Sequence, residues 1–227
     1  MNDTIEQTRA HIAEIGKLMY QRHLTDTAGG NLSVRVDDNT VCLTPRYAGG
    51  VMHWQLRPED VLVVTLDGEK LDGDGELSRE SKVHLALHRE LGAYGKAVVH
   101  CHARNMMVFA AMAQPMPAVL EGTLKFGELP VSGYAPSHSD DLATFVTEAM
   151  ATQVDKIPGH AAGVIAPWHG LFVMGKDLNL AFDAAERMDT NAYCILMGKM
   201  LGGQDNLAAQ RHALVEGITP YKQGEKH

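Results

Sequence analysis

The stretch Val98-Val99-His100-Cys101-His102 carries the strongest structural signal in the chain. Its β-branched start predicts a short buried strand, in which successive side chains alternate between the two faces. His100 and His102 therefore share a face, with Cα atoms about 6.5 Å apart. Two imidazoles at that spacing can bind one metal ion, with nitrogen–zinc distances of roughly 2.0 to 2.1 Å. Two core histidines with backbone hydrogen bonds fit the same pattern, so the pair alone predicts only half a metal site.

A third histidine lies in a predicted hairpin turn, where Pro167-Trp168-His169-Gly170 separates two apolar runs. We expect Gly170 to permit a tight turn and His169 to project from the sheet edge toward a neighbouring strand end. A histidine in such a turn is by itself more often a surface or capping residue. Together with His100 and His102 it completes a three-nitrogen set, which leaves one coordination position for a substrate oxygen.

A carboxylate precedes the histidine strand in the sequence Ser78-Arg79-Glu80. Ser78 is typical of a helix N-cap, which predicts a helix from Arg79 to about Leu91 with Glu80 in its first turn. A glutamate there also interacts favourably with the helix dipole, by about 0.3 to 1 kcal/mol, without any catalytic role. Beside a metal that acidifies a bound substrate, Glu80 becomes a candidate proton acceptor at carbon.

A glycine-rich loop, Gly29-Gly30-Asn31, comes before a predicted hairpin. Glycines let backbone amides approach an anion closely, and the Asn31 side chain adds a donor. A plain connecting loop explains the same residues equally well. Arg46 and Arg79 are suited to bind phosphate or carboxylate, although each also fits an ordinary surface charge.

The remaining pattern predicts strands that alternate with helices, and hence an α/β sheet with helices on both faces. Hairpins make the sheet largely antiparallel but mixed. The predicted strands are 32–36, 41–43, 61–66, 98–102, 129–131, 164–166 and 171–174; the predicted helices are 4–23, 79–91, 105–112, one after Ser139, and 178–201. Gly202-Gly203 is expected to end the last helix. We interpret 1–227 as a single domain with 203–227 as a C-terminal tail.

Composition narrows the class of protein. The chain has 227 residues, of which 45% are hydrophobic and 21% charged, and its net charge is -8. That acidity argues against general nucleic-acid binding, and no apolar run approaches the roughly 18 residues of a membrane span. Three scattered cysteines and a polar, acidic N-terminus without signal-peptide character favour a cytoplasmic protein.

In order along the chain, several of these motifs resemble the class II aldolase/adducin family. They are Thr27–Arg35, Leu43-Thr44-Pro45, Leu77-Ser78-Arg79-Glu80, Val98–His102, and His169-Gly170-Leu171 through Gly175-Lys176. The resemblance spans roughly residues 5 to 200. It implies a three-layer α/β/α fold, a homotetramer with active sites between subunits, and a divalent metal, usually zinc, with manganese or another divalent ion as alternatives.

The same resemblance implies roles for individual residues. It assigns metal binding to His100, His102 and His169 and acid/base chemistry to Glu80. Gly30, Asn31 and Ser78 match the family's phosphate-binding positions, whereas Arg46 and Arg79 stand where the family usually has small residues. Tyr221 matches a tail tyrosine that would protonate the aldehyde oxygen from a neighbouring subunit; an exposed tail residue is the alternative.

Four functions are compatible with these sequence features. The first is an aldolase that cleaves a ketose phosphate or related anionic ketol, through a metal-stabilised enediolate, to dihydroxyacetone phosphate or an analogue and an aldehyde. The second is a metal-dependent decarboxylase of a carboxylated substrate, which Arg46 and Arg79 would suit. A sugar-phosphate 4-epimerase is disfavoured because Glu121–Lys125 lacks the expected aspartate. A non-catalytic, adducin-like module would need neither the three histidines nor Glu80.

Overall fold

Seven strands form one sheet in the order β4-β3-β2-β1-β5-β7-β6, and every neighbouring pair is antiparallel. This computed structural model describes residues 3–222, with side chains from 4 to 219. The strands are β1 (Asn31–Arg35), β2 (Thr40–Leu43), β3 (Leu62–Thr65), β4 (Lys70–Asp72), β5 (Ala97–Cys101), β6 (Ala162–Ala166) and β7 (Gly170–Gly175). The histidine-bearing strand β5 thus lies inside the sheet, between β1 and β7.

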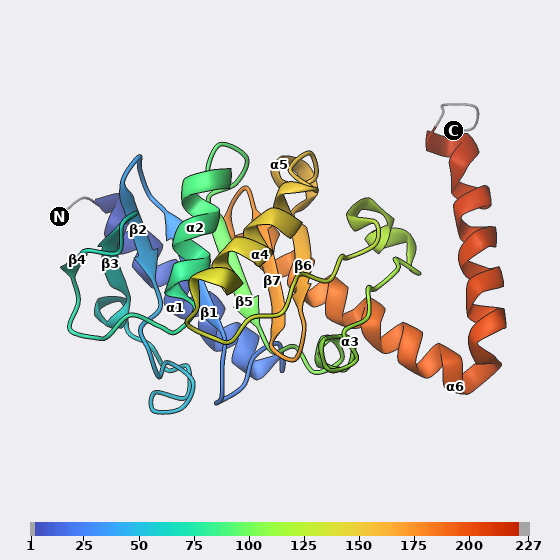
Figure 1. Ribbon diagram of the computed structural model, residues 1–227, viewed down its shortest axis with the longest axis horizontal. Coiled ribbons are helices and arrows are strands. Elements are labelled where there is room, and N and C mark those ends of the chain that lie inside the picture. Colours follow the sequence, from blue (N-terminus) through green and yellow to red (C-terminus); the bar gives the residue numbers. More distant parts are fainter. Residues whose placement is uncertain (1–2, 223–227) are drawn as a thin grey trace.

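Helices cover both faces of this sheet (Figure 1). They are α1 (Asp3–Gln21), α2 (Ser81–Leu91), α3 (Met106–Ala111), α4 (Asp140–Ala151), α5 (Ile157–His160) and α6 (Leu178–Lys222), with 3-10 turns η1 (Pro58–Asp60) and η2 (Glu121–Phe126). One core cluster packs α1, α3 and α6 against one face, and a second packs α2 and α4 against the other. The predicted three-layer α/β/α arrangement is confirmed.

Strand β5 shows the alternation that its sequence predicts. Val98 packs in the cluster under α2 and α4, whereas Val99 and Cys101 pack in the cluster under α1 and α6. His100 lies on the same face as Val98, because its ring stacks on Phe172 of the α2/α4 cluster with centroids 4.2 Å apart. The period-two pattern therefore directs His100 toward the helix that follows Glu80.

Some predicted elements differ from the structure. The segment 129–131 forms only isolated bridges, from Leu129 to Met116 and from Val131 to Ile165. The bridge at Val131 is the one parallel pairing among the described residues, so the sheet is more uniformly antiparallel than predicted. Strand β4 and helix α5 are short and lack a clear sequence period, and they were not predicted.

The C-terminal region departs further from the prediction. Helix α6 kinks at Gly203, which has φ 79° and ψ 169°, but it resumes and continues to Lys222. The prediction that Gly202-Gly203 ends the helix that begins at Leu178 is confirmed, since Gly203 is non-helical; the second helical part, which continues to Lys222, was not predicted, although its residues are good helix formers. Figure 1 shows this final part standing apart from the body of the molecule. Within this final part, Arg211 contacts the body of the molecule, because its Nε donates a 2.9 Å hydrogen bond to the Ala118 carbonyl.

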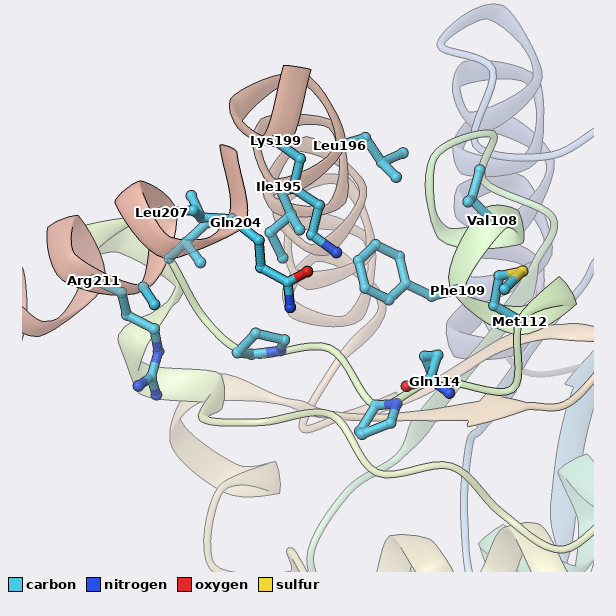
Figure 2. Close-up of a pocket in the computed structure, with 14 residues that line it drawn as sticks. Val108, Phe109, Met112, Gln114, Ile195, Leu196, Lys199, Gln204, Leu207 and Arg211 are labelled. Carbon is cyan, nitrogen blue, oxygen red and sulfur yellow. The ribbon is translucent and has the colours of Figure 1, made fainter. Parts of the chain in front are cut away.

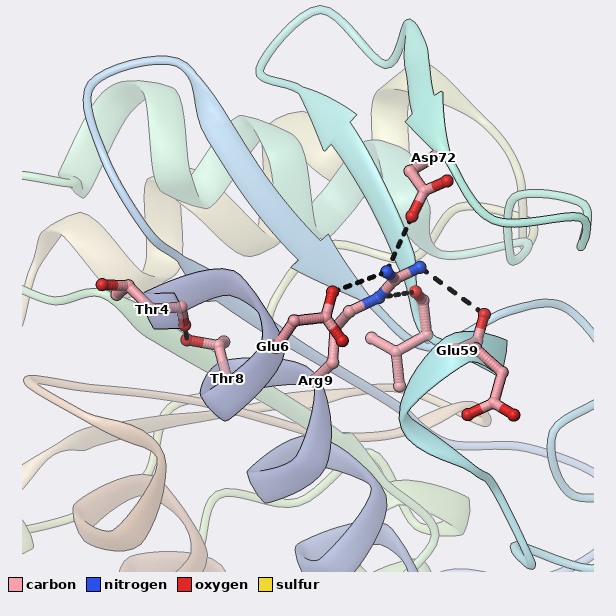
Figure 3. A network of polar contacts seen from close by, with 7 residues as sticks. Thr4, Glu6, Thr8, Arg9, Glu59 and Asp72 are labelled. Atoms are coloured by element: carbon pink, nitrogen blue, oxygen red, sulfur yellow. Dashed lines mark hydrogen bonds and ion pairs between the residues drawn. The ribbon is translucent and has the colours of Figure 1, made fainter. Parts of the chain in front are cut away.

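A buried arginine joins α1 to the far edge of the sheet (Figure 3). The side chain of Arg9 is 4% exposed, and its Nε donates to the Val61 carbonyl at 2.8 Å. Its Nη1 lies 2.7 Å from Asp72 and 3.1 Å from Glu6. The guanidinium therefore fixes α1 against β3 and β4.

None of the helices in residues 3–222 combines the length and apolar character that a membrane crossing requires.

Candidate metal centre

Strand pairing brings the two histidine segments together. His100 pairs with Phe172 of β7, and the turn that precedes β7 carries His169. His102 lies one residue beyond the end of β5, whereas the predicted strand 98–102 included it. The ring centroids of His100 lie 5.2 Å from His102 and 4.8 Å from His169. One nitrogen from each ring lies within 4.8 Å of the others, so the three side chains could hold a single metal ion.

The role of Gly170 differs from the one that the sequence suggested. In the β6–β7 turn the left-handed residue is Trp168, with φ 56°, and Gly170 has no positive φ. A Cβ at Gly170 would instead lie 2.7 Å from the Cys101 carbonyl oxygen and 3.0 Å from atoms of the His100 and His102 rings. Gly170 is thus required by the close approach of the β7 backbone to the histidine pair.

Each imidazole is held through Nδ1 by a neighbouring oxygen. The partners are the Leu171 carbonyl for His100 at 3.1 Å, Ser137 Oγ for His169 at 3.2 Å, and Asp26 Oδ1 for His102 at 3.4 Å. When Nδ1 donates its proton to an oxygen, Nε2 becomes the acceptor nitrogen that a metal needs. The Nε2 of His169 is buried and has no hydrogen-bond partner. An orphaned acceptor of this kind fits a metal ligand.

Electrostatics also favour neutral imidazoles at this centre. Burial lowers the pKa of His100 well below its ordinary value, and the neighbouring imidazoles lower it further. Burial, followed by the proximity of His102, lowers the pKa of His169 to about 4. The pKa of His102 is lowered by burial too, although Asp26 opposes this change. Neutral rings are the form in which histidine binds metal ions.

Glu80 lies beside the histidines. Helix α2 begins at Ser81, so Glu80 is its N-cap residue, and Ser78 is not the cap that the sequence predicted. The difference arises because the Ser78 carbonyl, rather than its hydroxyl, accepts a hydrogen bond from the Ser81 N–H at 3.2 Å. Glu80 Oε1 lies 3.7 Å from His169 Nε2. Burial raises the pKa of this carboxyl group. A hydrogen bond from its own backbone N–H and the positive charge of Arg79 oppose the rise.

A cavity of about 260 Å³ opens next to Glu80. It contains all five of the predicted substrate-binding residues, which are Gly30, Asn31, Arg46, Ser78 and Arg79. The register of β1 against β5 explains part of this proximity, because Asn31 pairs directly with His100. Asn31 Oδ1 and Ser78 Oγ are buried without hydrogen-bond partners. The cavity therefore presents unsatisfied polar groups beside the three histidines.

The two arginines of this cavity differ in their surroundings. Arg46 pairs with Glu76 through Nη1 at 3.0 Å, and its guanidinium lies 4.7 Å from the centre of the Tyr47 ring. Its Nε is buried without a partner. Arg79 is exposed and forms no ion pair within the described side chains. Arg79 thus brings a positive charge that no described carboxylate balances, whereas Arg46 is paired with Glu76.

The predicted tail residue Tyr221 lies in the last turn of α6, and its side chain falls outside the described side chains.

Two residues that contact the histidines were not predicted from the sequence. Ser137, which contacts His169, has no sequence signal of its own. Asp26 could have been found, because an aspartate two and three residues before Ala28 and Gly29 is typical of a side chain that accepts turn amides.

A second cavity, of about 480 Å³, contains none of the predicted site residues (Figure 2). It lies between α3, the segment after it, and both parts of α6 around the kink. Phe109, Ile195 and Leu207 give it an apolar lining, and the polar ends of Lys199 and Gln204 point in among them. This cavity holds no cluster of chemically active side chains, so the three histidines stay the candidate functional site.

Comparison with known proteins shows relatives along most of the chain. The chain is 27% identical over 199 residues to a 5-deoxy-D-ribulose 1-phosphate aldolase from Bacillus thuringiensis serovar kurstaki, covering 87% of this chain and 88% of that protein. It is 28% identical over 187 residues to a 3-oxo-tetronate 4-phosphate decarboxylase from Haemophilus influenzae, covering 80% and 83% respectively. Named relatives therefore carry out more than one reaction.

The fold has a close counterpart among solved structures. An L-fuculose 1-phosphate aldolase superimposes with a TM-score of 0.75 at 22% identity, covering 94% of this chain and 97% of that one. At that identity the likeness concerns the fold. Residues 10–196 match the family described as Class II Aldolase and Adducin N-terminal domain. The match spans all seven strands and the three histidines, and the chain belongs to the class II aldolase and adducin family.

Proposed function

We propose that the protein is a metal-dependent carbon–carbon lyase that cleaves a ketose phosphate, or a related anionic ketol, to dihydroxyacetone phosphate or an analogue and an aldehyde. The observation that carries this proposal is the position of Glu80. Its carboxylate lies 3.7 Å from His169 Nε2 and also lines the cavity that holds Asn31 and Ser78. One acid/base group thus faces both a set of metal ligands and a pocket suited to an anion.

His100, His102 and His169 would hold the metal, and we propose zinc because three neutral imidazoles with an open position are typical of catalytic zinc sites. Manganese or another divalent ion would accept the same nitrogens. When bound, the metal supplies Lewis-acid stabilisation of the negative charge that develops on substrate oxygens. The orphaned Nε2 of His169 supports this use of the site.

Glu80 would move the proton at carbon. In the cleavage direction the electrons of the broken carbon–carbon bond stay with the donor fragment, the aldehyde leaves, and protonated Glu80 returns a proton to the donor carbon. Burial supports this role, because it raises the pKa of Glu80 and so makes the protonated form accessible closer to neutral pH. We propose that Tyr221, from a neighbouring subunit of a homotetramer, exchanges the proton at the aldehyde oxygen.

The anion would occupy the cavity beside Glu80. Asn31 and Ser78 offer buried polar groups that have no partner within the chain, and Gly30 gives the backbone close access. Arg46 and Arg79 add positive charge to a chain that is acidic overall, which draws an anionic substrate to this position. Both phosphate and carboxylate suit such a pocket.

A metal-dependent decarboxylase is the second candidate. Two arginines in the cavity favour a substrate with a carboxylate as well as a phosphate, and a relative at 28% identity is named a 3-oxo-tetronate 4-phosphate decarboxylase. The same metal ligands would stabilise the charge left when carbon dioxide departs. Incubation with phosphorylated ketols that do or do not carry a carboxylate separates the two, because one reaction releases an aldehyde and the other releases carbon dioxide.

Glu80→Gln tests the proposal directly. The variant should retain its metal, measured by elemental analysis after purification without added metal, and should lose turnover by roughly 10²- to 10⁴-fold. Glu90→Gln is the matched control, because Glu90 lies on the same helix with its side chain exposed. Near-normal turnover in Glu80→Gln would remove Glu80 from the mechanism. Full metal occupancy in both His100→Ala and His169→Ala would refute the metal centre.

A further inference from the structure

Asp26 lies in the loop between α1 and β1, where one carboxylate oxygen contacts three nitrogen atoms. Oδ1 accepts hydrogen bonds from the backbone N–H of Ala28 at 2.8 Å and of Gly29 at 3.0 Å. The same oxygen lies 3.4 Å from Nδ1 of His102. The Asp26 backbone carbonyl accepts a 2.9 Å hydrogen bond from the indole N–H of Trp54, which is fully buried. Asp26 is therefore anchored to the core through its backbone.

These contacts join the two parts of the candidate site. His102 belongs to the metal-binding set, whereas Ala28 and Gly29 line the cavity beside Glu80. Loop and imidazole also touch directly, because a Cβ added at Gly29 would lie only 2.2 Å from Cε1 of His102. A shift of the His102 ring is therefore transmitted to the wall of the anion cavity, and a shift of the loop is transmitted to the metal ligand.

We propose that Asp26 is a positioning residue that couples metal binding at the three histidines to anion binding in the neighbouring cavity. The inference rests on the proposed function, since it takes the histidines as ligands and the cavity as the anion site. By holding Nδ1 of His102, the carboxylate fixes the ring with Nε2 toward the metal position. By holding two loop amides with the same oxygen, it keeps the cavity wall in the shape that the anion needs.

Coupling of this kind is reciprocal. If bound metal raises the affinity for an anion by some factor, the anion raises the affinity for the metal by the same factor. Carboxylates that orient metal-bound histidines typically account for 10- to 100-fold in metal affinity. We therefore expect zinc and inorganic phosphate to strengthen each other's binding by at least about five-fold in the unmodified protein.

Two substitutions separate the contacts of Asp26. Asp26→Asn keeps an acceptor oxygen for the Ala28 and Gly29 amides but removes the negative charge next to His102. Asp26→Ala removes both. Asp37 provides the matched control, because its Oδ1 accepts backbone N–H groups of Asn39 at 2.9 Å and Thr40 at 2.8 Å in a loop without site residues.

The experiment measures zinc affinity by chelator competition with and without inorganic phosphate, and phosphate affinity of the chelator-treated full chain by calorimetry. Asp26→Asn should weaken zinc binding about 10-fold while leaving the metal-free affinity for phosphate within about two-fold. Asp26→Ala should weaken both and bring the coupling factor toward one. Asp37→Asn and Asp37→Ala should match the unmodified protein.

The outcomes distinguish this inference from the proposed function. If the unmodified protein binds zinc and turns over substrate, but the Asp26 variants behave like the Asp37 variants, only the coupling role is overturned. Absence of zinc binding in the unmodified protein would overturn the metal centre and, with it, the role of Asp26. Should Asp26→Ala not fold, Asp26→Asn still decides, because an unchanged zinc affinity in that variant contradicts the proposal.

Discussion

A buried histidine pair on α2 should make the protein less stable in mild acid. His84 and His88 lie one turn apart on α2 with no exposed surface, and Ser33 Oγ bridges them at 2.7 Å from Nδ1 of His84 and 2.8 Å from Nε2 of His88. Their remaining ring nitrogens have no partner. Burial lowers the pKa of each imidazole to about 3, and His88 and Arg35 add smaller repulsions.

The direction follows from proton counting. Between pH 6.5 and about 3 the unfolded chain binds protons on both histidines and the folded chain does not, so the free energy of unfolding falls as the pH falls. Above pH 6.5 the stability is fully present. With a folded pKa of about 3, each histidine should cost about 2 kcal/mol between pH 7 and pH 5, and the pair about 4 kcal/mol.

His88→Gln isolates this contribution. The glutamine amide can still contact Ser33 but does not titrate, so the loss of unfolding free energy between pH 7 and pH 5 should shrink by about 2 kcal/mol. Urea denaturation of chelator-treated protein at one fixed concentration provides the measurement. His212→Gln is the control, because the His212 side chain is 75% exposed. An unchanged pH dependence in His88→Gln would refute the reasoning, since it would show that His88 titrates alike in folded and unfolded chains.

Three further changes test other parts of the structure. Gly29→Ala should lower zinc affinity by at least about ten-fold in a chelator competition, because the new methyl group would displace the His102 ring. Ser139→Ala should lower the free energy of unfolding, measured by urea denaturation, by about 1 kcal/mol, because Ser139 Oγ caps α4 by accepting the Leu142 N–H at 3.1 Å. Arg9→Met should destabilise by about 2 kcal/mol in the same assay, because Arg9 loses charged hydrogen bonds that its apolar replacement cannot make.

The sequence predicted the parts of the site that depend on local pattern. Alternation along β5 correctly placed His100 on one face and Cys101 on the other. Ser139 correctly marked the start of α4, where its hydroxyl accepts the Leu142 N–H. The predicted metal ligands and substrate-binding residues do lie close together, although their roles stay predictions. Short-range steric and hydrogen-bonding preferences decide these features, so a single sequence carries them.

Features that depend on strand register and loop path could not be predicted in the same way. The pairing of Asn31 with His100 places the anion cavity beside the metal ligands, and register follows from contacts among distant segments. The helix start at Ser81 likewise reflects tertiary context overriding the local cap signal of Ser78. Asp26 contacts His102 only because the loop folds back over the end of β5.

Burial shifts the pKa values of the basic and the acidic side chains of this centre in opposite directions. Burial under α2 and against Phe172 disfavours charge, and that lowers the pKa of His100 and His169 while raising the pKa of Glu80. The imidazoles are thereby kept neutral, with no second proton to compete with a metal for the acceptor nitrogen. Glu80, 3.7 Å from His169, is brought toward the range in which it can both accept and return a proton. Moving the cluster to the surface would weaken both properties together, so the covered position of the site is itself part of the chemistry that we propose.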